Sequence, residues 1–207
     1  MSLIYFGNTD FSKTIDPHIM TGDALVFRGV GFVSDAIETL TGWLSHFASC
    51  IRLGPAAWLI ESTTLDGKNG VQINRASKRV DDYQVGSDGA VYLLRLSAQE
   101  RSNLRENDFR TFLYAQVGKP YDKLLIAHLF FDRFQLVPAK PNWQSWICSE
   151  LGAEAAEKSG LLPASIDAAE VTPSMMAKYK MWDSDYYQVK GVKAEIPGFN
   201  SVEIPGR

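Results

Sequence analysis

The sequence SHFASCIRLGPAAWLIESTTLDGKNGVQINR, at residues 45–75, decides the fold because it holds three runs of strand length. Residues 45–53 and 58–62 are apolar runs, and residues 71–74 alternate apolar and polar side chains with a period of two. The turn DGKNG at residues 66–70 leads into the third run. Strands this close in sequence are joined by short turns, so we expect an antiparallel, curved sheet.

Further strands are predicted outside this region, at residues 24–27 (ALVF) and 90–96 (AVYLLRL). Capping and stop signals then predict helices at residues 32–44, 97–117 and 146–158, and a short helix opened by Thr172 and Pro173. Ser97 caps the second of these helices, and Gly118 and Gly160 end the second and third. Strands come first and helices follow, which is an α+β order and not an alternating βαβ order.

The chain has 207 residues, of which 45% are apolar and 22% charged, as expected for one soluble globular domain. We assign residues 21–189 to that domain. Residues 1–20 are predicted to be an irregular N-terminal segment. Residues 190–207, which are rich in glycine and proline, are predicted to be an extended C-terminal tail.

The charge and hydropathy patterns exclude several classes of function. The net charge is −3 and no basic patch stands out, so we expect no nucleic-acid partner. No apolar run is long enough to cross a membrane, and no signal peptide is visible, so the expected location is cytoplasmic by default. No phosphate-binding loop, zinc motif or serine-hydrolase elbow occurs, so we expect no metal and no cofactor. The sequence does not indicate the oligomeric state.

Cys148 lies where a predicted loop meets the helix at residues 146–158. The first turn of a helix has unpaired N–H groups and a positive dipole end, which favour the nucleophilic thiolate and can stabilise an oxyanion. A buried, inert thiol is the alternative, since free cysteines are usually buried. A disulfide with Cys50, the second of the two cysteines, is another.

A cysteine nucleophile needs a base, and the sequence has three histidines. His46 begins a predicted strand directly after a turn, a position that holds a side chain rigidly beside a cleft. His18 lies in the irregular N-terminal segment. His128 lies in the apolar run at residues 124–131, where a core histidine is expected. Local context therefore favours His46.

Glu61 is the candidate for the group that orients His46, as the third member of a catalytic triad does. It ends an apolar run, where a buried carboxylate needs a partner. If residues 45–53 and 58–62 pair as antiparallel neighbours, Glu61 comes close to His46. The alternative is a surface charge at the end of a strand.

Taken in order, a set of short segments resembles the circularly permuted NlpC/P60 papain-like cysteine hydrolases, and within them the YiiX/YaeF-like branch. These segments are residues 21–29 (TGDALVFRG), 45–46 (SH), 60–62 (IES), 70–73 (GVQI), 118–122 (GKPYD) and 148–151 (CSEL). In ordinary papain-like enzymes the cysteine precedes the histidine. In this branch a circular permutation places the histidine first, which is the order found here.

The resemblance covers residues 21–177 and implies a permuted papain-like fold. It implies Cys148 as nucleophile, His46 as base and Glu61 as the residue that orients His46. Tyr121 and Ser149 are implied to contact the substrate or the oxyanion. The implied reaction is hydrolysis of an amide through a thioester, with substrates such as cell-wall stem peptides that have a free amino end.

Two other functions remain open at this point. Lecithin:retinol acyltransferase-like proteins share the permuted arrangement, and the apolar residues 124–131 suit an acyl chain, so an acyl-lipid hydrolase or acyltransferase is the second candidate. A non-catalytic binding module is the third. It is expected if His46 and Cys148 lie beyond about 10 Å, outside the hydrogen-bond reach of a base.

The chain departs from the family pattern at two places. Phe47 stands after the histidine, where the family has valine or alanine, and Cys50 follows nearby. Gly152 stands after the Glu-Leu pair, where the family often has valine. Neither change alters a proposed catalytic atom, and both concern local packing.

Overall fold

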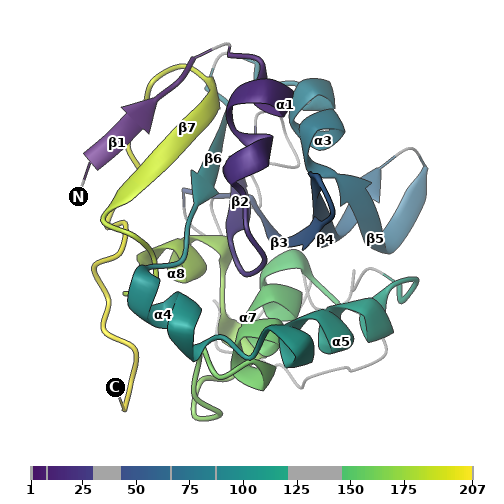
Figure 1. Cartoon of the computed structure of the whole chain (residues 1–207), viewed down its shortest axis with the longest axis vertical. Coiled ribbons are helices and arrows are strands. Elements are labelled where there is room, and N and C mark those ends of the chain that lie inside the picture. Colours follow the sequence, from purple (N-terminus) through teal and green to yellow (C-terminus); the bar gives the residue numbers. More distant parts are fainter. Residues whose placement is uncertain are drawn as a thin grey trace, which may run out of the picture.

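The protein has a mixed α+β fold built on a seven-stranded sheet, in the order β1-β7-β6-β2-β3-β4-β5. A computed structural model describes residues 2–7, 9–29, 43–65, 67–86, 88–120 and 146–206. Figure 1 shows α1 and α3 at one side of the sheet, and α5 and α7 at the other. The sheet is therefore covered on both faces.

The strands and helices follow the chain in a simple order. The strands are β1 (Ser2–Tyr5), β2 (Ala24–Arg28), β3 (His46–Leu53), β4 (Ala56–Leu65), β5 (Lys68–Arg75), β6 (Ala90–Leu94) and β7 (Asp185–Gly191). The helices are α1 (Phe11–Thr14), α3 (Ala76–Asp82), α4 (Ala98–Asn103), α5 (Glu106–Gln116), α7 (Cys148–Lys158) and α8 (Pro173–Lys178), with two 3₁₀ turns, η1 (Asp16–His18) and η2 (Ala168–Glu170).

The antiparallel arrangement predicted for residues 45–75 is confirmed. β3, β4 and β5 pair in succession, with Ser49 opposite Ile60 and Ile60 opposite Ile73. β2 is antiparallel to both β3 and β6. Because helices cover both faces, both sets of alternating side chains in the central strands are buried, which explains why their sequences read as continuous apolar runs.

The N-terminal segment was predicted to be irregular, but it forms β1, α1 and η1. β1 pairs in parallel with β7 at the edge of the sheet, and Phe11, Ile15 and Ile19 are buried in the core under α1 and η1. Asp16 and Pro17 open η1, because proline suits the first turn of a helix. The Asp16 carboxylate also accepts a hydrogen bond from the backbone of Ala57 at 2.7 Å.

The C-terminal residues 190–207 also differ from the prediction of an extended tail. Two of them complete β7, which runs from Asp185 to Gly191. Beyond that strand, Ile196, Phe199 and Ile204 are buried in the same core cluster as α7 and α8. Glycine and proline make turns here that return the chain to the core, so they do not indicate a loose end.

The helix predicted at residues 97–117 is two helices, α4 and α5. Its start is confirmed, since the Ser97 hydroxyl accepts a hydrogen bond from the backbone of Glu100. The chain turns at Leu104, whose side chain packs against the core, and the Arg105 backbone donates to Ser159 at the end of α7. Core packing therefore interrupts a helix that local signals favour.

The remaining helices are mostly where they were expected. α7 and α8 match the predictions, and Thr172 caps α8 through a bond from the Met175 backbone. The helix predicted at residues 32–44 lies outside the described residues except for its last two positions.

Candidate active site

Cys148 is the first residue of α7, as its sequence context predicted. The preceding Ile147 has no side-chain oxygen to cap the helix, although its own backbone N–H is bonded by the Glu150 carboxylate at 3.3 Å. First-turn N–H groups are therefore left for another acceptor. The Cys148 sulfur accepts hydrogen bonds from the backbone N–H groups of Ser149 and Phe47, the second of which lies on β3.

Close contact between α7 and β3 brings the thiol to this strand. Gly152, one turn along α7, faces the Phe47 ring, and a Cβ added at this glycine would lie 2.4 Å from a ring carbon. The helix therefore lies directly on the strand. Only a residue without a side chain fits between them.

His46 begins β3 and lies between Cys148 and Glu61. Its Nε2 is 2.6 Å from Oε2 of Glu61, and its ring also shares a hydrogen bond with the Cys148 thiol. Since Nε2 is engaged by the carboxylate, Nδ1 is the nitrogen left for the sulfur. The imidazole is thus held at both nitrogens, in the arrangement that a general base next to a nucleophile requires.

Glu61 is fully buried on β4 and is held by two further side chains. Asn74 on β5 donates to Oε1 at 2.9 Å. Arg79 on α3 donates through Nε to Oε1 at 3.2 Å and to Oε2 at 3.3 Å. The carboxylate therefore has a partner for each oxygen, as a buried charge needs.

Sequence reasoning did not find Asn74 or Arg79. Arg79 is only 8% exposed, and its guanidinium carbon lies 4.5 Å from the centre of the Phe27 ring and 5.3 Å from that of Tyr83. The period-two pattern of β5 places Asn74 on the same face as Glu61, which was the available signal. No local pattern marks Arg79, because an arginine in a short polar segment is usually on the surface.

The charges of these groups alternate along the chain of contacts. Burial on its own would lower the pKa of His46, but Cys148 and Glu61 raise it from 6.5 to about 9. Burial would raise the pKa of Cys148, but the charge and hydrogen bond of His46 lower it below its ordinary value. Thiolate, imidazolium, carboxylate and guanidinium thus follow one another, and each buried charge meets an opposite one.

Burial would also raise the pKa of Glu61, but the hydrogen bond and charge of His46, the charge of Arg79 and the bond from Asn74 lower it. Glu61 therefore stays ionised and can hold a charged imidazole. Glu61 therefore connects Arg79 on α3 and Asn74 on β5 to the ring of His46.

The other predicted site residues have different outcomes. The Ser149 side chain is fully buried, and its hydroxyl has no hydrogen-bond partner within the described ranges, so only its backbone N–H faces the sulfur of Cys148. Tyr121 lies outside the described residues, as does His128. His18 lines a separate small cavity near Tyr187.

Both cysteines are free, so the alternative of a disulfide is wrong. Cys50 is fully buried in β3, and burial raises the pKa of its thiol well above the ordinary value. The two thiols therefore differ sharply in chemistry, because among the described residues a histidine lies beside Cys148 and none lies beside Cys50.

Comparisons with known proteins give little further information. No protein-family model matches the chain, and no curated protein matches it. Among solved structures, the chain is similar to metalloprotein yiiX from Escherichia coli O157:H7, with 16% identity and a TM-score of 0.48. The match covers 68% of this chain and 66% of the length of that one. A likeness of this degree identifies neither a family nor an activity.

In the part of the chain that the structure describes, no group of three or more His, Cys, Asp and Glu side chains is placed to hold a metal ion. None of the helices in the same ranges has the length and apolar character needed to span a bilayer.

Proposed function

We propose that this protein is a cysteine hydrolase that cleaves an amide through a thioester on Cys148. The observation that carries the proposal is the position of His46. Its ring is hydrogen-bonded on one side to a thiol at a helix N-terminus and on the other to a buried carboxylate. This arrangement supplies a nucleophile, a base and an orienting group in contact with one another.

In the first half of the reaction, the Cys148 thiolate attacks the carbonyl carbon and forms a tetrahedral intermediate. The N–H groups of the first turn of α7 can donate to the oxyanion. The imidazolium of His46 then gives its proton to the leaving amine, the C–N bond breaks, and the acyl group stays on the sulfur. Glu61 keeps the imidazole oriented throughout.

In the second half, neutral His46 removes a proton from a water molecule, which attacks the thioester. The C–S bond breaks, a carboxylic acid leaves, and the proton held by His46 restores the starting ion pair. Glu61 stabilises the imidazolium each time it forms, and Arg79 and Asn74 keep this carboxylate in place.

The resemblance to the permuted NlpC/P60 hydrolases supports the same roles. Its motifs place the histidine on a strand before the cysteine helix, and His46 on β3 and Cys148 on α7 agree with that order. The resemblance also supports peptide substrates such as cell-wall stem peptides. We propose, on the same resemblance, that the fold is a circularly permuted papain-like fold.

The two alternatives have less support. The acyl-lipid function was based on residues 124–131, which lie outside the described residues. The binding module was expected if His46 and Cys148 were too far apart for a hydrogen bond, and these two side chains share one.

The direct test is to trap the thioester. The protein is incubated with a panel of peptide amides and acyl-lipid esters, acid-quenched, and digested for mass spectrometry. We expect an acyl adduct on Cys148 and a fall in turnover of at least about 10³-fold in Cys148→Ala, while Cys50→Ser retains its activity. Turnover that survives in Cys148→Ala contradicts the proposal. An adduct formed only from lipid esters favours the acyl-lipid function.

A further inference from the structure

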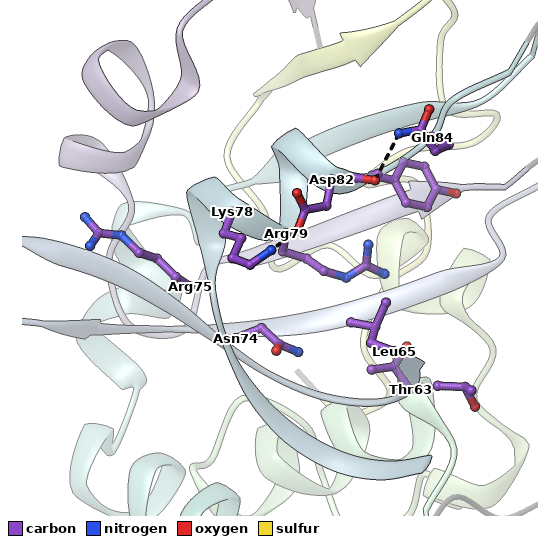
Figure 2. Close-up of a pocket in the computed structure, with 10 residues that line it drawn as sticks. Thr63, Leu65, Asn74, Arg75, Lys78, Arg79, Asp82 and Gln84 are labelled. Atoms are coloured by element: carbon purple, nitrogen blue, oxygen red, sulfur yellow. Dashed lines mark hydrogen bonds and ion pairs between the residues drawn. The ribbon is translucent and has the colours of Figure 1, made fainter. Parts of the chain in front are cut away.

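A cavity of about 430 Å³ lies next to Glu61, between the β4–β5 hairpin and α3 (Figure 2). Its volume falls within the range of small-molecule sites, which is about 300–1,000 Å³. The side chains around it are mainly polar or cationic and include Thr63, Thr64, Asn74, Lys78, Arg79 and Tyr83. Asn74 and Arg79 are the two residues that hold Glu61.

Among the side chains that line the cavity, Arg79 is the one suited to bind an anion. It is nine-tenths buried, and the Phe27 and Tyr83 rings fix the plane of its guanidinium. Its Nε donates to Glu61, whereas its two Nη atoms make no hydrogen bond within the described ranges. A guanidinium has five N–H donors in a planar fork, so four of them are left. In Figure 2 this fork extends toward the side of the cavity where Leu65 lies.

The neighbouring charges favour an anion with a single negative charge. Arg75, Lys78 and Arg79 line the cavity together with a single acidic residue, Asp82. Lys78 is already paired with Asp82 across one helical turn. The Arg75 side chain extends away from Arg79 (Figure 2). One planar fork therefore faces the cavity, and its geometry matches the two oxygens of a carboxylate.

The cavity also lies close to the reaction centre. Glu61 Oε2 is 2.6 Å from His46 Nε2 and 3.3 Å from Arg79 Nε, so one carboxylate separates the guanidinium from the imidazole. Glu61 and Arg79 thus connect His46 to this cavity.

We propose that the cavity is a subsite for a carboxylate of the substrate, so that the substrate is an amide with a carboxylate near the scissile bond. The assignment of the cavity to the substrate rests on the function proposed above. In this account Arg79 has two roles. It recognises the substrate carboxylate through its Nη atoms, and it positions Glu61 through Nε.

Binding is measured first, by calorimetry on the Cys148→Ala protein, so that the result does not depend on catalysis. The probes are glutarate, its neutral diamide glutaramide, and inorganic phosphate. We expect glutarate to bind and the diamide and phosphate to bind at least about tenfold more weakly, because charge-assisted bonds to a planar fork are lost. Equal binding of glutarate and glutaramide overturns the proposal.

Three variants locate the binding. Arg79→Gln removes the guanidinium. Leu65→Trp fills the cavity at a residue that does not belong to the series of charged groups from Cys148 to Arg79. Both are expected to weaken glutarate binding at least about tenfold. Arg105→Gln makes the same change of charge at an exposed arginine outside the cavity and is expected to leave the Kd within about twofold. If Arg79→Gln does not fold, Leu65→Trp still decides. Equal losses in Arg105→Gln and Leu65→Trp contradict a defined site.

The link to Cys148 is tested with alkylating reagents that differ only in a carboxylate. Iodoacetyl derivatives of glycine, β-alanine and γ-aminobutyrate are compared with their neutral amides on the active protein. At one of these lengths we expect the acid to react with Cys148 at least about tenfold faster than its amide, and glutarate to abolish this preference. The acid-to-amide ratio cancels any effect of a variant on His46.

The outcomes separate this inference from the function proposed above. An acid-to-amide ratio near one at every length, in a protein whose Cys148 reacts rapidly with iodoacetamide, overturns the subsite and leaves the nucleophile intact. A Cys148 that reacts with none of the reagents contradicts the hydrolase itself, whatever glutarate does.

Discussion

At the scale of single residues, the sequence predicted the contact between His46 and Glu61 but not the residues that support it. The pairing of two neighbouring strand runs was enough to expect Glu61 near His46, and the two side chains lie 2.6 Å apart. Arg79 and Asn74 were missed. The reason is physical, because the need of a buried carboxylate for cations and donors is met by residues that only the tertiary fold brings together.

The contact between His46 and Glu61 gives a prediction for Glu61→Gln. The amide keeps the shape but loses the charge, so the pKa of His46 should fall and turnover should drop by about 10²–10⁴-fold. Kinetics and NMR titration of the imidazole measure both effects. The matched control is Glu154→Gln, which changes a buried glutamate on α7. It should leave the pKa of His46 and the turnover unchanged. An unaltered titration of His46 in Glu61→Gln would show that the carboxylate does not act on it.

Arg79 gives a second prediction at this scale. Arg79→Met leaves Glu61 buried with one partner fewer, and breaking a buried ion pair costs about 3–5 kcal/mol of unfolding free energy. Urea denaturation measures the loss. Lys78→Met, on the adjacent exposed position of α3, should change stability by less than about 1 kcal/mol. Similar values for the two variants would contradict the structural role of Arg79.

At the scale of elements, the strongest signals were the central strands and the capped helices. β2 to β6, α7 and α8 were expected from apolar runs, turns and caps, and they form. β1, β7 and α3 were missed because each is short and partly polar, with few apolar side chains to set a period. The break between α4 and α5 was missed because core contacts of Leu104 override the local preference for a helix.

The two positions at which the sequence departs from the NlpC/P60 pattern that it resembles meet in one contact between elements. Phe47 on β3 is larger than valine or alanine, and Gly152 on α7 is smaller than valine. The ring occupies the space that a side chain on the helix would take. The backbone of Phe47 also donates a hydrogen bond to the Cys148 sulfur. The large ring and the small glycine together therefore let α7 lie close enough to β3 for this bond.

This exchange predicts the effect of Gly152→Ala. The added methyl group meets the Phe47 ring, so overpacking should lower the free energy of unfolding by about 1–3 kcal/mol. The double variant Gly152→Ala, Phe47→Leu removes the clash and should recover part of the loss. Chemical denaturation of the three proteins measures both values. A single variant as stable as the original, or a double variant without recovery, would show that the contact is not tight.

At the scale of the whole molecule, both chain ends were predicted to be peripheral, and both belong to the sheet or the core. The assignment of residues 21–189 to one domain stays a prediction. The pairing of β1 with β7 could not be predicted from the sequence, because it joins segments from opposite ends of the chain. No local pattern records such a distant contact.

The C-terminal segment gives the prediction for this scale. Deletion of residues 194–207 removes Ile196, Phe199 and Ile204 from the core. Each buried apolar side chain contributes about 1.5–3 kcal/mol, so the loss should approach the total stability of a domain of this kind. Thermal unfolding by circular dichroism measures it. Deletion of residues 205–207 alone is the control and should leave the Tm unchanged. Equal Tm values for the two deletions would contradict the packed C-terminus.

The ion pair of Cys148 and His46 is tested by the rate of Cys148 alkylation by iodoacetamide as a function of pH. The rate is measured on the Cys50→Ser protein, with and without His46→Ala. We expect the rate to reach half its maximum well below pH 8.5, the ordinary pKa of a thiol, and removal of His46 to abolish this low-pH reactivity. A Cys148 that titrates at or above the ordinary value, with no change in His46→Ala, would contradict the ion pair and with it the proposed hydrolase.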